Sequence, residues 1–395
     1  MTDEVFDMKK TIAAVLLLLA AGACLLGLMH QQLDTSPWDS SFYNSYTRQA
    51  MAWREGAFHL PEDVPYLELA IYEGEYYVSF PPVPTLPELL CTFFWGMDTP
   101  DNALVAFYGL MALLGIFYGL RKQGFSRLSS ALYGFFLTFA SCLLPLFLTG
   151  AVWYQAQTLA FALTVWAIAL VSAGHSTPGL FLYALAVGCR PFNVMYGPAM
   201  MLIFCLDRKE QGLTANIKKM SPGIGLGLCV AAAYAVFNYL RFGNPLEFGH
   251  NYLPEFSTQG GVQFSLDHVA KNAETFLLGW PFDASGQFEK FGFSLFIACP
   301  ALAYLVLRTL WDGVRRQLTW QRGIVFLCFA AQLFALLLHR TFGGFQFGAR
   351  YTADLIPYMF MYVMTKERKR FTWHEGLLYA AGLAFSIWGT LNVHL

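Results

Sequence analysis

Repeated apolar runs, each about as long as a bilayer is thick, constrain this chain more than any other feature. The first run, residues 11–29, follows Lys9 and Lys10 and is long enough to cross a membrane as a helix. We interpret it as a retained span, because a cleaved signal would have a shorter core and a small-residue cleavage site. Of the 395 residues, 56% are hydrophobic and 13% are charged, whereas soluble domains average about 25% charged residues. The sequence therefore predicts an all-α polytopic membrane protein, with residues 1–395 forming one transmembrane domain.

The later runs predict further spans, at residues 101–120, 129–148, 154–173, 179–190, 192–206, 221–240, 291–311, 323–339, 353–365 and 376–393. The stretch 179–206 reads either as one long span or as two short ones broken at Arg190-Pro191-Phe192-Asn193. If the stretch forms two spans, most lysines and arginines fall in loops on one side of the membrane. If it forms one span, every later loop changes sides and this asymmetry of charge is lost. The positive-inside rule assigns the basic side to the cytoplasm. We therefore predict about 11 spans, a cytoplasmic amino terminus, and extracytoplasmic loops 30–100, 241–290 and 340–353.

The first long loop is both polar and rich in tyrosine and tryptophan. Apolar residues at helical spacing predict an amphipathic interfacial helix over Asp39–Glu55. Residues 82–96 are apolar but short for a span and contain prolines, which favours a re-entrant or interfacial segment. Between them, the alternation in LAIYEGEYYVSFPP predicts a hairpin with its turn at Glu73-Gly74. We expect this loop to carry the active site, with the membrane spans as its scaffold.

Several classes of chemistry are not indicated. The net charge is −1 and no basic stripe is present, which argues against nucleic acid as a partner. The eight cysteines are scattered through apolar stretches without CxxC or zinc spacing, so we interpret them as small apolar residues. No Walker loop, HExxH, nucleophile elbow or DxD occurs. We therefore expect neither a cofactor nor a metal.

Asp39 is the candidate general base. It follows the first span by about ten residues and would lie at the outer membrane surface, where a carboxylate can deprotonate a hydroxyl group. The alternative is that Asp39 caps the interfacial helix, which is common for aspartate. The two roles are compatible. Asp34 and Asp63 are nearby alternatives for the base.

Four basic residues besides Arg190 lie at or near predicted span ends. Arg190 sits in an apolar stretch, where an arginine costs about 2.5–3.5 kcal/mol on insertion scales and usually faces a partner or a cavity. Arg241 and Arg350 either snorkel to the interface or form, with His339 and Arg340, a cationic pocket for a phosphate. A lipid phosphate would arrive at this depth.

The hairpin tyrosines are the remaining candidates. Tyr76 and Tyr77 fit an aromatic belt at the headgroup level, or a lining for a sugar or a lipid head. We place Asp63 and Glu68 of the same loop with them as candidate substrate-binding residues.

Four patches of the chain resemble a known family. They read YLELAIYEGEYYVSFPPVPTLPELL, GCRPFN, YLRFGNPLEFGHNY and FQFGARYTADLIPYM. In these patches and in its layout the chain is similar to GT-C fold glycosyltransferases, especially the bacterial members allied to protein mannosyltransferases and to the lipid A aminoarabinose transferase. The resemblance implies a multi-pass protein of the bacterial cell membrane.

The resemblance also implies a reaction. The donor would be a polyprenyl-phosphate sugar, and an inverting transfer on the outer face would move the sugar to a hydroxyl of a lipid, glycan or protein acceptor. The family's first-loop aspartate falls on Asp39, and its phosphate-binding arginine on Arg241 or Arg350. Many relatives have Lys or His before the Pro-Pro pair, where this chain has Phe80. Phosphate recognition here would therefore depend more heavily on the arginines.

Two other functions compete with this one. A lipid or solute transporter or flippase would suit helices broken at Arg190-Pro191 and in the proline-rich segment 81–87. A catalytically inactive GT-C-like subunit is the other alternative, which Phe80 keeps open. A transporter should tolerate Asp39→Asn and lose function when Arg190 is changed, whereas a transferase should depend strongly on Asp39.

Overall fold

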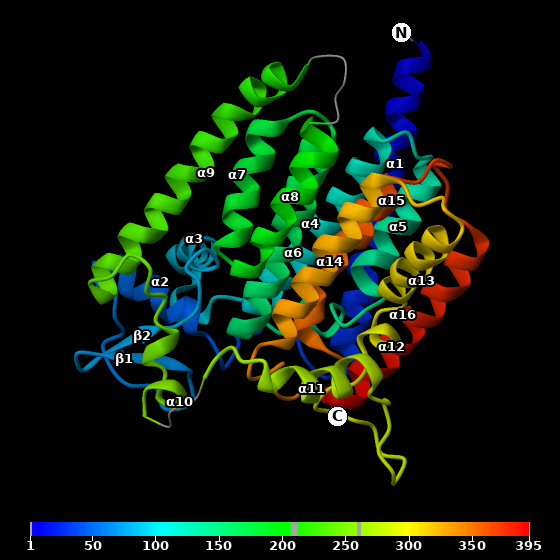
Figure 1. The fold of residues 1–395 in the computed structure, drawn as a ribbon. Coiled ribbons are helices and arrows are strands. Elements are labelled where there is room, and N and C mark those ends of the chain that lie inside the picture. The colour runs from blue at the N-terminus through cyan, green and yellow to red at the C-terminus, as the bar shows by residue number, and fades with distance from the viewer. Residues whose placement is uncertain (1, 207–211, 259–261, 395) are drawn as a thin grey trace.

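Helices that run between two opposite faces make up most of the structure (Figure 1). The computed structural model describes residues 2–206, 212–258 and 262–394. The strands are β1 (Leu69–Tyr72) and β2 (Glu75–Val78). The helices in chain order are α1 (Thr2–Gln32), α2 (Ser45–Arg54), α3 (Thr85–Trp95), α4 (Asp101–Lys122), α5 (Arg127–Phe139), α6 (Val152–Ser172), α7 (Ser176–Val187), α8 (Tyr196–Met200), α9 (Gly212–Phe242), α10 (Pro254–Ser257), α11 (Asp267–Ala273), α12 (Leu295–Ala298), α13 (Pro300–Val314), α14 (Trp320–Leu337), α15 (Ile356–Met364) and α16 (Trp373–His394).

Six of these helices are long and apolar enough to cross a membrane, namely α1, α4, α6, α9, α14 and α16. The other predicted spans also contain helix, but in shorter pieces. The predicted span 129–148, for example, is helical only as far as Phe139, apart from a short 3₁₀ turn. The Ser141 hydroxyl there accepts a hydrogen bond from the Leu143 N–H, and Pro145 follows, both of which oppose helix. The predicted count of about 11 spans is therefore not confirmed.

The break predicted within 179–206 is confirmed. Helix α7 ends at Val187, and a 3₁₀ segment, Pro191–Met195, leads into α8. Arg190 between them is extended (φ −142°, ψ 105°), as expected for a residue that precedes proline. The chain thus makes two short helical segments in place of one long span.

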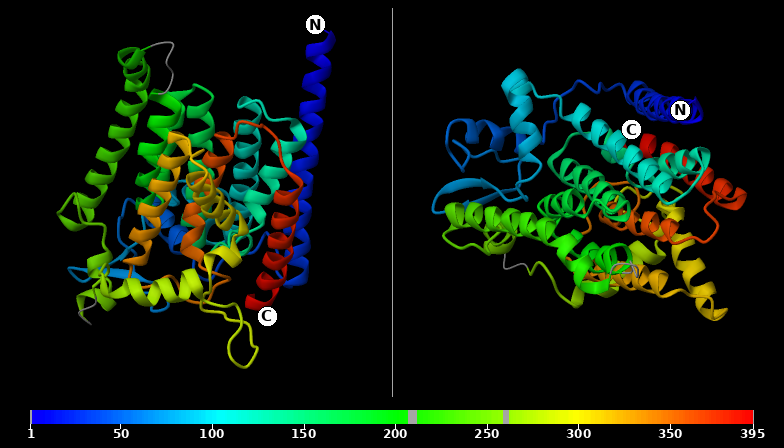
Figure 2. Two further views of the ribbon diagram at one scale, coloured as in Figure 1. Left: turned by 45° about the vertical axis from the view of Figure 1, so that its right-hand side comes forward. Right: turned by 90° about the horizontal axis from the view of Figure 1, so that it is seen from above.

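The two faces of the molecule differ in what they carry. The hairpin β1–β2, helices α10 and α11, and the end of α16 lie together at one face, and the start of α1 lies at the opposite one (Figure 1). We call the first the loop face, formed by residues 33–84, 243–258, 262–290 and 339–350. Helix α9 lies at the edge of the bundle and packs against α7 (Figure 2). Parts of all three predicted loops thus lie on one face.

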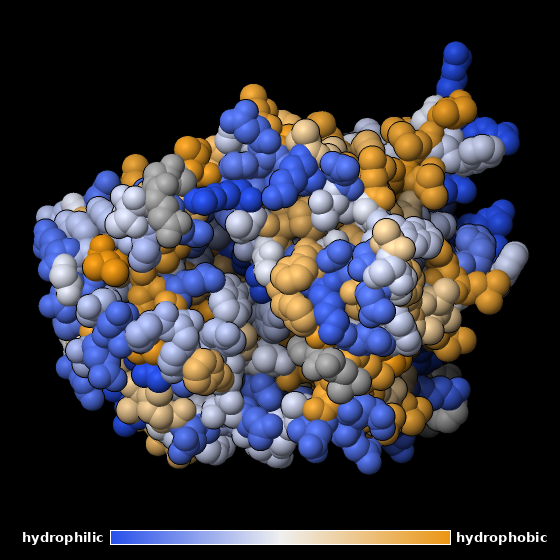
Figure 3. Space-filling view, turned by 90° about the horizontal axis from the view of Figure 1, so that it is seen from below, coloured by the Kyte–Doolittle hydropathy of each residue, from blue (hydrophilic) through white to orange (hydrophobic). Residues whose placement is uncertain are grey.

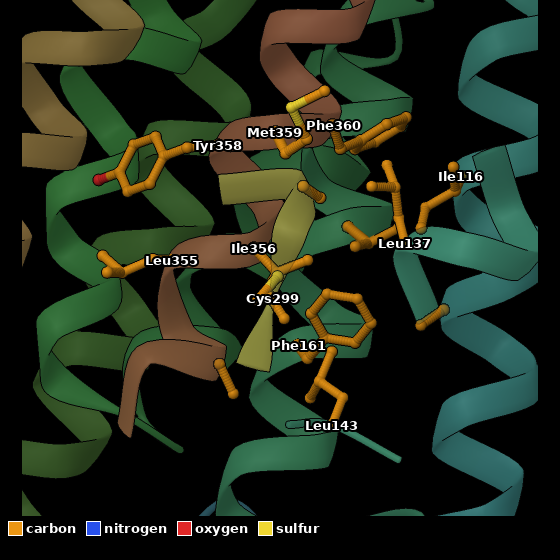
Figure 4. Packing of buried hydrophobic residues seen from close by; sticks show 14 of the residues in the cluster. Ile116, Leu137, Leu143, Phe161, Cys299, Leu355, Ile356, Tyr358, Met359 and Phe360 are labelled. Carbon is orange, nitrogen blue, oxygen red and sulfur yellow. The ribbon is translucent and has the colours of Figure 1, made fainter. Parts of the chain in front are cut away.

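The core is built around α15, in which every residue from Ile356 to Met364 is buried. A helix that is apolar on all sides belongs in a protein interior. Met359 and Phe360 pack there near Ile116 of α4 and Leu137 of α5 (Figure 4). This helix anchors the 3₁₀ segment Arg350–Leu355 that immediately precedes it.

The predicted hairpin is confirmed. Strands β1 and β2 pair antiparallel, with Tyr72 opposite Glu75. Both turn residues are left-handed, Glu73 at φ 52° and Gly74 at φ 83°, as two-residue hairpin turns of type I′ require. The fold is therefore helical apart from this one small sheet among the described residues.

Helix α3 is amphipathic with its polar side turned inward. Its buried side chains include Thr85, Glu88 and Thr92, whereas Leu90 and Phe94 are exposed. Its 11 residues are too few to cross a bilayer. An apolar face turned outward agrees with the predicted interfacial segment over 82–96.

The helix predicted over Asp39–Glu55 begins later than expected, with Asn44 at its N-cap. Asp39 therefore does not cap it, and that alternative is wrong. Helix α2 is also not a surface helix with one apolar side inward, because Thr47 and Gln49 are buried as well. Its polar residues meet the polar side of α3, a contact that spacing within either segment alone could not reveal.

Candidate functional site

Arg190 lies at the break after α7 and is neutralised across the fold. Its Nε and Nη2 donate to one carboxylate oxygen of Asp354, at 2.9 and 2.7 Å. The Arg190 side chain is 20% exposed and that of Asp354 is 3% exposed. The guanidinium also lies 5.0 Å from the ring centre of Tyr351. The partner that a buried arginine demands is therefore present.

Arg350, by contrast, has no carboxylate partner among the described residues. The residue is 6% exposed, and its Nε has no hydrogen-bond acceptor. Its guanidinium lies 5.7, 5.3 and 5.3 Å from the ring centres of Trp153, Tyr154 and Tyr351. Aromatic faces attract a cation without neutralising it. The rings thus hold a buried positive charge in place, and the charge is available to pair with a bound anion.

The backbone of Arg350 explains how this geometry is fixed. Its N–H donates to the Gln346 side chain at 2.7 Å, and its carbonyl accepts from the Gln157 amide at 3.1 Å. Gln157 belongs to α6, which also carries Trp153 and Tyr154 in its first turn. The start of α6 and the segment before α15 therefore build the cage together.

Two polar side chains border this cage. Glu68 accepts a hydrogen bond from Trp153 Nε1 at 3.1 Å. Partial desolvation raises the pKa of the Glu68 carboxyl, and the hydrogen bond from Trp153 and the charge of Arg350 oppose the rise. The ring of His339 lies 5.7 Å from that of Tyr351. Burial and, to a smaller extent, the charge of Arg190 lower the pKa of His339 to about 4, so His339 is neutral at pH 7.

We call this group the two-arginine cluster, meaning Arg190, Arg350, Trp153, Tyr154, Tyr351, Asp354, Glu68 and His339. The loop face has a recess near its centre, bordered mainly by hydrophilic residues (Figure 3). Phe80 has its ring centre 6.5 Å from that of Trp153. The cluster has two arginines and two carboxylates, of which Asp354 pairs with Arg190 and the exposed Glu68 lies at the border. Arg350 is buried and forms no ion pair, so it is the residue that can receive an anion.

Two of the predicted phosphate ligands lie elsewhere. Arg241 donates to the Val78 carbonyl and to Asn238, both at 3.0 Å, and its guanidinium lies 4.1 Å from the Phe237 ring centre. It therefore ties β2 to α9. Arg340 donates to the Glu255 carbonyl at 3.3 Å and so supports the α10 region. Of the five predicted phosphate ligands, the structure brings together Arg190, Arg350 and His339.

Asp39 lies in the loop after α1 and is exposed. Its Oδ2 accepts a hydrogen bond from the Ser36 N–H at 2.7 Å, and its carbonyl accepts one from the Asn102 N–H of α4 at 3.4 Å. The same loop reaches the cluster through Tyr43, whose ring centre is 5.0 Å from that of Trp153. Asp39 is thus close in sequence to a residue that contacts the cluster.

The remaining candidates are spread around the hairpin. Asp63 is exposed, and its neighbours Glu62 and Val64 line a surface pocket on α2. The Tyr76 carbonyl accepts from the Leu60 N–H at 2.7 Å. Tyr77 is 9% exposed and packs against Phe242. Tyr77 therefore lies in a local core, away from the two-arginine cluster.

Sequence reasoning missed the residues that complete the cluster, namely Trp153, Tyr154, Tyr351 and Asp354. One signal was available for Asp354, because a buried arginine requires an acid and Asp354 ends the Gly-Ala-Arg-Tyr-Thr-Ala-Asp patch. No signal marked the aromatic residues, which are common throughout this chain. The described residues also include no group of three or more His, Cys, Asp or Glu side chains that could hold a metal ion.

The comparisons with known proteins bear on the fold. No family model and no curated protein matches the chain. An oligosaccharyltransferase of Archaeoglobus fulgidus, solved tethered to an acceptor peptide with the NVT sequon, is 13% identical with a TM-score of 0.51, covering 96% of this chain and 55% of that one. The archaeal oligosaccharyltransferase AglB of Archaeoglobus fulgidus, solved with an inhibitory peptide and a dolichol-phosphate, is 10% identical with a TM-score of 0.47, covering 98% and 56%. This chain thus spans about half the length of those proteins. The likeness is distant, and it shows that the chain has the fold of the GT-C glycosyltransferases.

Proposed function

We propose that this chain is a membrane glycosyltransferase that moves a sugar from a polyprenyl-phosphate donor to an acceptor hydroxyl at the loop face, with inversion. The observation that carries the proposal is the buried guanidinium of Arg350, which forms no ion pair among the described residues and whose Nε has no hydrogen-bond acceptor. A lone buried charge is costly unless something pairs with it. A phosphate group of a bound substrate would supply that pair, and arginine binds phosphate with charge-assisted hydrogen bonds.

The two arginines have different proposed roles. Asp354 already neutralises Arg190, so Arg190 adds hydrogen-bond donors and little net charge. Arg350 supplies the positive charge that a departing lipid phosphate needs, since negative charge grows on the phosphate as the glycosidic bond breaks. His339 is neutral at pH 7 because its pKa is about 4, so it adds no charge.

The proposed chemical step is a single displacement. The acceptor oxygen attacks the anomeric carbon, the bond from that carbon to the phosphate oxygen breaks, and the lipid phosphate keeps the electron pair. The acceptor proton passes to the carboxylate of Asp39, one oxygen of which is held by the Ser36 N–H. Glu68 is the second candidate for this proton, because it borders the cluster and has a raised pKa.

The proposed setting is a bacterial cell membrane, with the loop face outside and the amino terminus in the cytoplasm. In support, the hairpin and the predicted outer loops share one face, and α1 begins at the opposite face beside Lys9 and Lys10 (Figure 1). Basic residues near span ends favour the cytoplasmic side. The acceptor would be a lipid, a glycan or a protein that reaches the loop face.

Sugar transfer by purified protein tests the proposal. A panel of short-chain polyprenyl-phosphate sugars is offered to the wild type and to the Arg350→Gln, Asp39→Asn and Glu68→Gln variants, and sugar transfer and lipid phosphate release are measured. The control is Arg315→Gln, which removes an exposed arginine that lies over Trp311. We expect Arg350→Gln to reduce turnover about 10²–10³-fold, as the loss of one oxyanion donor does, and Arg315→Gln to change nothing.

The outcomes separate the alternatives. Full activity in Arg350→Gln would refute the role of Arg350. Loss in Glu68→Gln with full activity in Asp39→Asn would move the base from Asp39 to Glu68. If no donor turns over, movement of labelled lipid phosphate across proteoliposomes, lost in an Arg190→Gln variant, would indicate a flippase.

A further inference from the structure

A second group of acids lies away from the two-arginine cluster and plays no part in the proposed step. Glu88 of α3 and Asp101 at the start of α4 are both fully buried. Their carboxyl groups share one neighbour. The hydroxyl of Thr47 on α2 lies between them, 3.4 Å from Glu88 Oε2 and 3.1 Å from Asp101 Oδ1. Two adjacent buried carboxylates repel each other, so this pair requires a compensating positive charge or a proton.

Asp101 is equipped to be the ionised member. Its Oδ2 accepts from the Ser41 N–H at 2.8 Å, and its Oδ1 is the nearer acceptor for the Thr47 hydroxyl. It also occupies the first turn of a 22-residue helix, where the helix dipole favours negative charge. Both carboxylate oxygens of Asp101 therefore have a donor.

Glu88 lacks what an ionised acid needs. Its Oε1 has no hydrogen-bond partner, and the side-chain oxygen of Gln155 on α6, also fully buried, has none either. The amide of Gln155 donates one hydrogen to the Gly150 carbonyl at 2.9 Å, and its interaction with Glu88 opposes the rise in the pKa of that carboxyl group. The two unpartnered oxygens, Glu88 Oε1 and Gln155 Oε1, thus have no hydrogen to share between them. One proton on Glu88 would turn an acceptor into a donor and satisfy a neighbouring oxygen.

We propose that Glu88 is a neutral carboxylic acid whose proton is shared with Asp101, and that this shared proton positions the two loops flanking the two-arginine cluster. Asp101 holds the loop that contains Asp39, through the Ser41 N–H. Helix α3 begins just after the Phe80 loop, where the Val83 N–H donates to the Gly188 carbonyl beside Arg190. Glu88 and Asp101 are accordingly positioning residues.

The neighbouring charges allow this assignment. Glu88 interacts electrostatically with Asp101 and Tyr108 on α4 and with Cys91 on α3. None of these three groups is cationic. Arg54 of α2 contacts α3 one turn further on, at the Thr92 carbonyl. Burial, followed by the charge of Asp101, raises the pKa of Glu88 well above its ordinary value.

The sign of the pH dependence follows from the raised pKa. A carboxyl group whose folded-state pKa exceeds its unfolded value gives full stability below the unfolded pKa, and the protein loses stability as the pH rises towards the folded pKa. Each pH unit in that window shifts the folding equilibrium about tenfold. A glutamine at position 88 keeps a hydrogen-bond donor at every pH and should remove this dependence.

The test is the thermal unfolding midpoint of purified full-length protein between pH 5 and pH 9, for the wild type, Glu88→Gln and a control, Glu55→Gln, which changes an exposed acid next to α2. We expect the midpoint of Glu88→Gln minus that of the wild type to increase with pH, and the control difference to stay flat. A flat difference for Glu88→Gln would overturn the proposal. Stabilisation of the wild type by Mg²⁺ or Ca²⁺, abolished in Glu88→Gln, would also overturn it in favour of a bound cation.

A second measurement covers the case in which Glu88→Gln does not fold. Infrared spectra of the wild type should show the C=O band of a protonated carboxylic acid at pH 7, and its absence would contradict the proposal. Neither measurement needs substrate, so both stand apart from the transfer assay. The consequence for catalysis does rest on the proposed function: the wild type should lose turnover at alkaline pH, and Glu88→Gln should retain it.

Discussion

The ion pair between Arg190 and Asp354 allows a quantitative test of the site. The two residues are 164 positions apart and join the break after α7 to the segment before α15. Removal of one partner leaves a buried charge unpaired, which costs about 3–5 kcal/mol. Because Arg190 keeps 20% exposure, we expect the lower end for Asp354→Leu, about 3 kcal/mol. Arg190→Met leaves the more deeply buried Asp354 and should cost more.

The double variant separates stability from function. A buried pair replaced by apolar side chains of similar volume is often neutral in stability. Arg190→Met with Asp354→Leu should therefore recover at least about 2 kcal/mol relative to the sum of the two single changes. It should still lose sugar transfer, because the guanidinium is gone.

Equilibrium unfolding of the four proteins in one detergent, followed by circular dichroism, gives the coupling energy. Transfer from a polyprenyl-phosphate sugar is measured on the same samples. A coupling energy below about 0.5 kcal/mol would show that the two residues act independently and would refute the reasoning. A double variant that is stable and fully active would remove Arg190 from the proposed site.

Two further predictions concern packing and pH. Gly150→Ala should destabilise the protein by about 1–3 kcal/mol, because the added Cβ would overlap the Cβ and the backbone of Asp101. Gly225→Ala in α9 is the matched control, since nothing lies within 4 Å of a Cβ added there. Equal unfolding midpoints for Gly150→Ala and the wild type would contradict the prediction. His339→Gln should protect the protein against acid, since the folded-state pKa of His339 is about 4: as the pH falls from about 6.5 to 4 the wild type loses stability. Unfolding midpoints over that range measure the effect, and an identical acid limb in both proteins would count against it.

Features that depend on local chemistry could be predicted from the sequence. The turn at Glu73-Gly74 follows from two residues that tolerate a left-handed backbone better than branched ones. The break at Arg190 follows from the proline after it. The long helices follow from apolar length alone. In each case a few neighbouring residues determine the outcome.

Features that depend on distant partners could not be predicted. The spacing within residues 39–55 predicts a helix. It cannot predict that Thr47 of this helix faces two acids from α3 and α4. Arg241 and Arg350 looked equivalent in the sequence, because each lies near a span end beside glycine and phenylalanine. The structure distinguishes them by their surroundings: Arg241 donates to the Val78 carbonyl, whereas the guanidinium of Arg350 lies among three aromatic rings and its Nε has no hydrogen-bond acceptor.

The inverted polarity of α3 has a consequence for how the chain is made. As α3 is synthesised, its apolar side can settle at the membrane surface at once, and Thr47 of α2 is already available to Glu88, but the other buried polar groups of the site are not yet made. Asp101 and Gln155 belong to α4 and α6, which come later in the chain. Until α6 is translated, α3 can therefore dock only on α2, and a chain halted before residue 152 should leave this corner incomplete and more open to proteases.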